Sequence, residues 1–89
     1  MTTQIYFRME AVKGKVLLAD ANKLTRFAKY ELNNGVLEIL CASMDKAHYY
    51  RDLFLTKKFK KEYKVCARVH RFYQTIDGGI KENNKFIDL

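Results

Sequence analysis

Hydrophobic and polar positions alternate near the start of the chain, which is the pattern of a strand with one buried face. Over Gln4 to Val12 the two sides of the pattern are Ile5, Phe7, Met9 and Ala11, and Gln4, Tyr6, Arg8 and Glu10. Successive side chains of a strand point to opposite faces, so the first set is expected to pack in a core. Lys13-Gly14 then predicts a turn in which Gly14 supplies a positive φ.

The next segment permits two interpretations. Val16 to Ala19 can form a short returning strand, or it can lead into a helix. Asp20 or Asn22 can cap a helix that runs to about Leu32. Apolar residues at spacings of three and four form one stripe along it: Leu17, Ala21, Leu24, Ala28 and Leu32. Asn33-Asn34-Gly35 is expected to end this helix, because Asn and Gly tolerate the left-handed conformation of a C-cap.

A nearly all-apolar run from Val36 to Cys41 predicts a short central strand that is covered on both faces. Ser43 can cap a second helix, which is expected to begin at Met44 and to end between Thr56 and Lys61. Its predicted buried side is Ala47, Phe54, Leu55 and Phe59, with Met44 and Tyr50 at the edges.

Alternation returns in the last third of the chain, where Tyr63 to Ile76 predicts a long strand. Its apolar side is Tyr63, Val65, Ala67 and Val69, and its other side is Lys64, Cys66, Arg68, His70 and Phe72. Asp77-Gly78-Gly79 is a strong hairpin signal, so Ile80 to Ile87 is expected to return as an edge strand.

The order of these elements, β(β)αβαβ(β), predicts an α+β fold. We expect two helices packed on a small, mainly antiparallel sheet of three to five strands, as a two-layer sandwich. The 89 residues are 48% hydrophobic and contain no proline, which predicts one basic folded domain over 1–89. No apolar run approaches the roughly 18 residues of a membrane span, and the first residues lack the pattern of a secretory signal. We therefore expect a cytoplasmic protein with no membrane partner and with reduced thiols at Cys41 and Cys66.

Positive charge is concentrated in one part of the chain. The formal net charge is +7, and residues 41–75 carry nine Lys and Arg against three acidic residues. Residues 57–73 alone hold seven of the seventeen Lys and Arg, interleaved with aromatic rings. A local positive field attracts polyanions, whereas a basic surface kept only for solubility does not require such clustering.

This basic and aromatic segment is the candidate binding site. If the alternation holds, the even-numbered residues of the long strand share one sheet face, which Tyr6 and Arg8 can join from a neighbouring strand. The predicted phosphate-binding residues are Arg8, Lys57, Lys58, Lys60, Lys61, Lys64, Arg68 and Arg71, and the predicted stacking residues are Tyr6, His70 and Phe72. Core packing is the competing interpretation of the rings, and helix-end stabilisation accounts for part of the lysine cluster.

Other chemistries lack a supporting motif. Cys41, His48, Cys66 and His70 do not have the paired spacing of a zinc site, so we expect no metal and no cofactor. A Cys–His nucleophile, or His70 acting as the base of a ribonuclease, has no local motif, and the glycines are placed as turn residues. The protein is therefore expected not to be an enzyme.

Two hypotheses about function remain ahead of the small ribonuclease. The first is a small binding protein for nucleic acid, RNA more than DNA. The alternative is an inhibitor or adaptor that docks its basic face on an acidic surface of a nuclease, toxin or defence factor, with or without bridging nucleic acid. A monomer and a homodimer are both compatible with the edge strand at Ile80 to Ile87. No protein family is recognised across the chain, which resembles small accessory proteins of bacterial viruses only in its composition.

Overall fold

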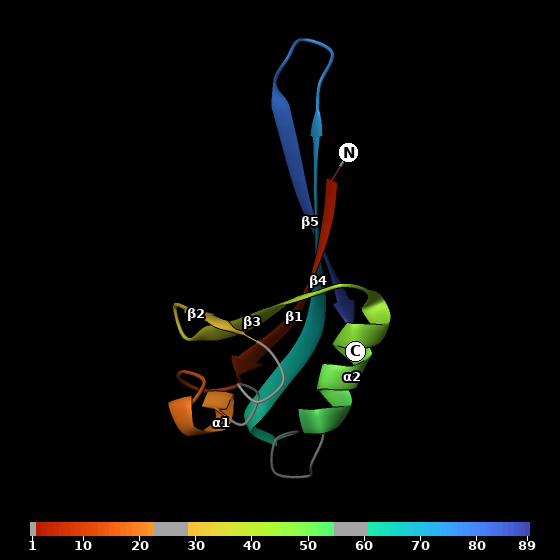
Figure 1. Cartoon of the computed structure of the whole chain (residues 1–89). Coiled ribbons are helices and arrows are strands. Elements are labelled where there is room, and N and C mark those ends of the chain that lie inside the picture. Colours follow the sequence, from red (N-terminus) through yellow and green to blue (C-terminus); the bar gives the residue numbers. More distant parts are fainter. Residues whose placement is uncertain (1, 23–28, 55–60) are drawn as a thin grey trace.

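The computed structural model describes residues 2–22, 29–54 and 61–89, and it shows an antiparallel sheet of five strands with two helices (Figure 1). The elements are β1 (Thr2–Ala11), α1 (Leu18–Asn22), β2 (Glu31–Asn33), β3 (Val36–Cys41), α2 (Met44–Phe54), β4 (Tyr63–Gln74) and β5 (Ile80–Asp88). The strands lie in the order β2-β3-β1-β4-β5. The predicted α+β class and antiparallel sheet are confirmed, whereas the two-layer arrangement is met only roughly.

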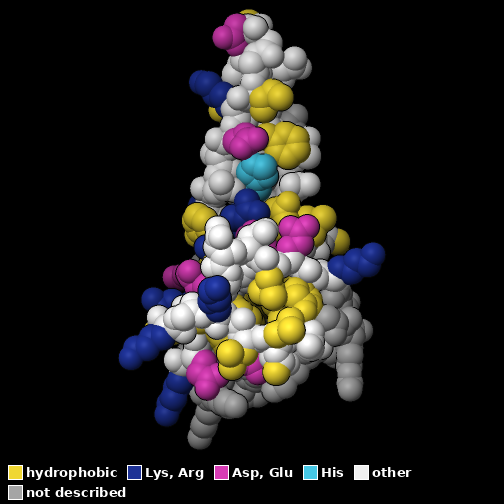
Figure 2. Space-filling model, turned by 90° about the vertical axis from the view of Figure 1, so that its left-hand side faces the viewer, with side chains coloured by type: hydrophobic (Ala, Val, Ile, Leu, Met, Phe, Trp, Pro, Cys, Tyr) yellow, Lys and Arg dark blue, Asp and Glu magenta, His cyan; other side chains and the backbone are white. Residues whose placement is uncertain are grey.

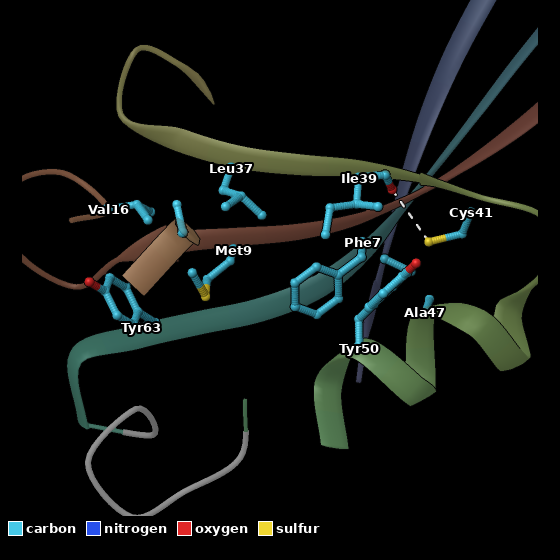
Figure 3. Close-up of a cluster of buried hydrophobic side chains, with 11 residues drawn as sticks. Phe7, Met9, Val16, Leu37, Ile39, Cys41, Ala47, Tyr50 and Tyr63 are labelled. Atoms are coloured by element: carbon cyan, nitrogen blue, oxygen red, sulfur yellow. Dashed lines mark hydrogen bonds between the residues drawn. The ribbon is translucent and has the colours of Figure 1, made fainter. Parts of the chain in front are cut away.

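The centre of the fold is the pairing of β1 with β4, which extends from Thr2 opposite Phe72 to Ala11 opposite Tyr63. Odd-numbered residues of these two strands share one face with the odd-numbered residues of β3. The largest fully buried side chains on this face are Phe7, Met9, Leu37 and Ile39 (Figure 3). Burial of each such side chain contributes about 1.5–3 kcal/mol, so this cluster is the main source of stability.

Helix α2 covers the middle of this face and begins where the sequence predicts. The Ser43 hydroxyl accepts a hydrogen bond from the backbone N–H of Lys46 at 3.4 Å, as a helix cap does. Ala47 and Tyr50 are buried, and the Tyr50 ring lies 5.9 Å from the ring of Phe7 (Figure 3). Tyr50 is therefore a core residue and not an edge residue as predicted. The predicted continuation of the helix through 55–60 and the predicted buried side chains of 54, 55 and 59 fall outside what the structure describes.

The predicted helix to Leu32 is wrong at its end, because 31–33 form strand β2. This strand pairs with β3 through a two-residue turn, in which Asn34 has φ 53° and Gly35 has φ 79°. Both positive angles suit a type I′ hairpin turn. Asn-Gly serves equally as a helix C-cap or as such a turn, and the long-range pairing of β3 with β1 selects the turn. The positions of the predicted stripe at 24 and 28 lie outside the described residues.

Around α1 the sequence interpretation also needs correction. Leu18 begins a helix, so Val16 to Ala19 is not a returning strand, and Leu17 is 60% exposed instead of buried. Asp20 lies inside α1 and does not cap it. Its buried carboxylate accepts a hydrogen bond of 2.6 Å from the Tyr63 hydroxyl, which itself accepts one from the backbone N–H of Leu17. Burial, and next the bond to Asp20, raise the pKa of Tyr63.

Strand β3 is covered on only one face, contrary to the prediction. Leu37, Ile39 and Cys41 are buried, while Leu40 on the other face is 60% exposed. Neither described helix lies over that other face, so an apolar residue there remains in contact with water.

Beyond the Ile5–Cys41 pair, only β1, β4 and β5 continue the sheet. This part, from Ile5, Val69 and Lys85 out to the hairpin turn at 75–79, is called the arm. It extends above β2, β3 and α2 and makes the molecule long, with extents of 49 × 26 × 21 Å (Figure 1). The predicted hairpin is confirmed, although β4 ends at Gln74 and not at Ile76, and β5 pairs over its whole length.

Neither of the two described helices has the length and apolar character that a membrane crossing would need.

We expect Tyr63→Phe to lower the free energy of unfolding by about 1.5–3 kcal/mol, because it removes a hydrogen bond to a buried carboxylate. Urea denaturation monitored by circular dichroism measures the change. Tyr49→Phe is the matched control, because Tyr49 is 42% exposed. A loss of stability no larger than that of the control would show that the Tyr63–Asp20 bond does not stabilise α1.

Candidate functional site

The structure brings most of the described candidate residues onto one face, as the alternation predicts. The β1–β4 register places Tyr6 opposite Arg68 and Arg8 opposite Cys66. The even-numbered side chains of β1, β3, β4 and β5 point away from α2, together with the odd-numbered side chains of β2, and we call this side the outer sheet face. Its members among the predicted site residues are Tyr6, Arg8, Lys64, Arg68, His70 and Phe72.

Arg68 lies at the centre of the outer sheet face, where other side chains already hold it. Its Nε and Nη2 donate to the two carboxylate oxygens of Glu38 at 2.6 and 3.2 Å, and its Nη1 donates to Asn84 at 2.9 Å. The guanidinium also lies 4.3 Å from the centre of the Tyr6 ring. Both partners of the ion pair are less than one fifth exposed, and the bonds to Glu38 raise the pKa of Arg68. This fork-like geometry suits a structural ion pair.

Arg8 is held in a similar way. It lies 3.8 Å from Glu38 and 3.9 Å from Glu10, and its guanidinium lies 5.5 Å from the centre of the Phe86 ring. Tyr6 donates a hydrogen bond to Gln4 at 2.9 Å. The two arginines and Tyr6 are therefore engaged by other side chains within the sheet.

Further along the arm, His70 lies beside an acid and a ring. Its Nε2 is 3.7 Å from a carboxylate oxygen of Glu82, and its ring is 5.3 Å from that of Phe72. Figure 2 shows the histidine of the arm in cyan, next to acidic and hydrophobic side chains. An attraction to Glu82 requires a protonated His70 and competes with binding of an anion.

Acids outnumber cations on the outer sheet face. By strand register, its cations are Arg8, Lys64 and Arg68, and its acids are Glu10, Glu31, Glu38, Glu82 and Asp88. A face with this balance does not concentrate the positive field that the sequence suggested. The sequence did not indicate this balance, because Glu38 pairs with Arg68 across 30 residues and no local pattern predicts such a contact.

The remaining predicted cations lie elsewhere. Arg71 is exposed on the opposite face of β4, and Lys61 is exposed just before β4 begins. The predicted phosphate-binding lysines at 57, 58 and 60 fall outside the described residues.

Arg71 has basic neighbours that the sequence analysis missed. In β5, Lys81 lies opposite Tyr73, Asn83 lies opposite Arg71, and Lys85 lies opposite Val69. Thr3 of β1 lies on the other side of Arg71. We call this exposed surface the basic arm face; its residues are Thr3, Arg71, Tyr73, Lys81, Asn83 and Lys85. The sequence of β5 could have indicated this face, since its lysines are odd-numbered and its acids even-numbered.

The cations of the basic arm face have no partner in the part of the chain that the structure describes. None of Arg71, Lys81 and Lys85 forms an ion pair there, in contrast to Arg8 and Arg68. Among the six residues of this face there is no acid. Residues diagonally opposite on neighbouring strands are about 7–8 Å apart, so each lysine lies near Arg71.

The thiols and histidines of the described residues are not gathered into a metal-binding cluster. Within residues 2–22, 29–54 and 61–89, no group of three or more His, Cys, Asp or Glu side chains is placed to hold a metal ion. Both cysteines are free, and burial raises the pKa of Cys41 and of Cys66. A raised pKa keeps both thiols protonated, which makes them weak nucleophiles.

Comparison of the chain with protein-family models, with curated proteins and with solved structures finds no match.

We expect a double-mutant cycle of Arg68→Ala and Glu38→Ala to give a coupling energy of about 1–3 kcal/mol, because each single change removes both hydrogen bonds of the ion pair from a mostly buried partner. Urea unfolding of the two single variants and the double variant measures it. The neighbouring pair Arg51 and Asp52, also in contact at 2.8 Å but with Asp52 66% exposed, is the control and should couple by less than about 1 kcal/mol. Equal coupling in both pairs would mean that the pair between Glu38 and Arg68 is an ordinary surface contact.

Proposed function

We propose that this protein is a small non-enzymatic nucleic-acid-binding protein, with RNA favoured over DNA, and that the basic arm face is its contact surface. The observation that carries the proposal is the separation of charge across the arm: the odd-numbered positions of its described strands hold three cations and no acid, while on the other face Glu82 lies 3.7 Å from His70. Unpaired cations held close together repel each other, and an anion relieves that repulsion.

The shape of the arm favours a single strand over a duplex. Three strands form a narrow platform, and neither described helix lies over it (Figure 1). Tyr73 is 41% exposed beside Lys81, so a base can stack on its ring while its phosphate contacts the lysine. Unstacked bases are accessible in single strands and loops, which in RNA are the usual targets of sequence recognition.

Predicted site residues outside the basic arm face contribute to binding to different extents in this proposal. Lys64 and Lys61 are exposed and available for electrostatic attraction, while Arg8 and Arg68 act mainly through the structure of the sheet. His70 and Phe72 lie across the arm from Arg71, so a strand bound by Arg71 does not reach them on the same face.

We expect Arg71→Gln, Lys81→Gln and Lys85→Gln together to weaken binding of a single-stranded RNA and to reduce its salt dependence. The slope of log K against log salt is negative, and loss of three phosphate contacts should reduce its magnitude by about 2. Fluorescence anisotropy with a labelled oligonucleotide, at a series of salt concentrations, measures both effects.

The matched control is Lys13→Gln, Lys15→Gln and Lys29→Gln, which removes the same charge from exposed lysines away from the arm. This variant should keep most of the salt slope. Equal losses in the two triple variants would show that net charge and not the basic arm face governs binding. No salt-dependent binding by the unaltered chain would overturn the proposal as a whole.

A second candidate, docking on a protein, has one observation in its favour. The end of the hairpin exposes Ile76 and Ile80 together with Tyr73, around a shallow hollow. Large apolar side chains gathered at an exposed tip are typical of protein contact sites. Recovery of the same protein partner before and after nuclease treatment, and its loss with Ile76→Ser and Ile80→Ser, would favour this candidate.

A further inference from the structure

One edge of β5 pairs with no described strand along its nine residues. Its other edge pairs with β4 in an unbroken register from Ile80 opposite Gln74 to Asp88 opposite Cys66, with no bulge. Natural proteins protect such an edge with proline, bulges, short length or charge, and β5 has only its charged side chains. The opposite edge of the sheet, β2, is only three residues long. Strand β5 is therefore the longest open edge in the described sheet.

We propose that two copies of this chain associate by antiparallel pairing of β5 with β5, around a two-fold axis at Asn84. A two-fold axis perpendicular to the sheet leaves the odd-numbered residues of both copies on one face and the even-numbered residues on the other. Residues directly opposite each other must then both be odd or both be even, so the axis must lie at a residue and not between two residues. An axis at Asn84 pairs all nine residues, from Ile80 opposite the partner's Asp88 onwards. Every other axis pairs fewer.

Charge selects the same register. An axis at Asn83 sets Lys81 opposite the partner's Lys85, and an axis at Glu82 or Lys85 sets that residue opposite its own copy. Like charges directly opposite each other destabilise a strand pair. With the axis at Asn84, Glu82 faces the partner's Phe86, Lys81 faces the partner's Ile87 and Lys85 faces the partner's Asn83. No like charges are then directly opposite.

Exposed apolar side chains also meet in this register. Phe86 and Ile80 are 56% and 73% exposed in one copy. With the axis at Asn84, Phe86 lies diagonal to the partner's Ile80, within the reach of an aromatic ring. Symmetry repeats this contact, so two apolar pairs flank the central Asn84 on the outer sheet face. Asn84 accepts from Arg68 through its oxygen, which leaves its amide N–H groups to donate across the axis.

The other face of the pair gives the dimer a consequence for binding, which rests on the proposed function. The two basic arm faces become continuous, because each Lys85 lies next to the partner's strand. Lys81 is diagonal to the partner's Lys85, and a bound polyanion offsets this repulsion. Nucleic acid should therefore tighten the dimer, and the dimer should bind longer strands better than one copy does.

Cysteine cross-linking tests the register directly. Asn84→Cys places two thiols opposite each other across the axis, where paired strands have Cα atoms about 4.5–5.5 Å apart, a separation that a disulfide spans. Under mild oxidation this variant should form a linked dimer on a non-reducing gel. Asn83→Cys is the control, because it faces the partner's Lys85 and lies out of reach of its own copy; the unaltered chain controls for Cys41 and Cys66.

Sedimentation of nuclease-treated protein tests the dimer without cross-linking. The unaltered chain and Gln74→Lys, which adds charge on β4 away from the edge, should sediment as dimers. Asn84→Lys should sediment as a monomer, because it sets two lysines opposite each other at the axis. Equal cross-linking of the two cysteine variants, or an unaltered chain that is a monomer at high concentration, overturns the dimer. Neither assay contains nucleic acid, so failure of the dimer would not contradict nucleic-acid binding, which the anisotropy measurements test separately.

Discussion

The long antiparallel pairing of β1 with β4 is the constraint on which the rest of the structure depends. Ten consecutive residue pairs hold the two central strands in one register, and a slip of one residue would turn every buried side chain toward water. Burial of Phe7 and Met9 on one strand and of Ala67 on the other fixes that register. Once it is fixed, the face of every side chain on β3 and β5 follows from its pairing with these two strands.

This constraint also decides which charges are available for binding. Arg68 is an even-numbered residue, so it points to the same face as Glu38 of β3 and forms a bidentate ion pair with it. A partly buried arginine needs such a partner, because its desolvation is costly. Arg71 has the opposite parity and no acid beside it, and β5 adds Lys81 and Lys85 to the same side. The sheet therefore holds the paired charges of Arg68 and Glu38 on one face and the unpaired cations of the arm on the other.

Agreement between sequence and structure was closest where local pattern and long-range pairing act together. β1 and β4, the cap at Ser43 and the hairpin after Gln74 follow from alternation, capping and turn chemistry. The segment before β3 was misinterpreted because Asn34-Gly35 suits a helix end and a hairpin equally. In that segment a modest helical stripe competed with strand pairing, and the hydrogen bonds of β2 with β3 prevailed over local preference.

Alternation along the chain was enough to determine which side chains share a face, since the two-residue period of a strand is a property of the backbone. The same two-residue period also determines that the lysines of β5 lie on one face and its acids on the other. Only the tertiary structure decided which face α2 covers, that Glu38 holds Arg68, and that the arm is open on both sides. Those features depend on contacts between residues far apart in sequence, and the energy of such contacts cannot be deduced from the local pattern.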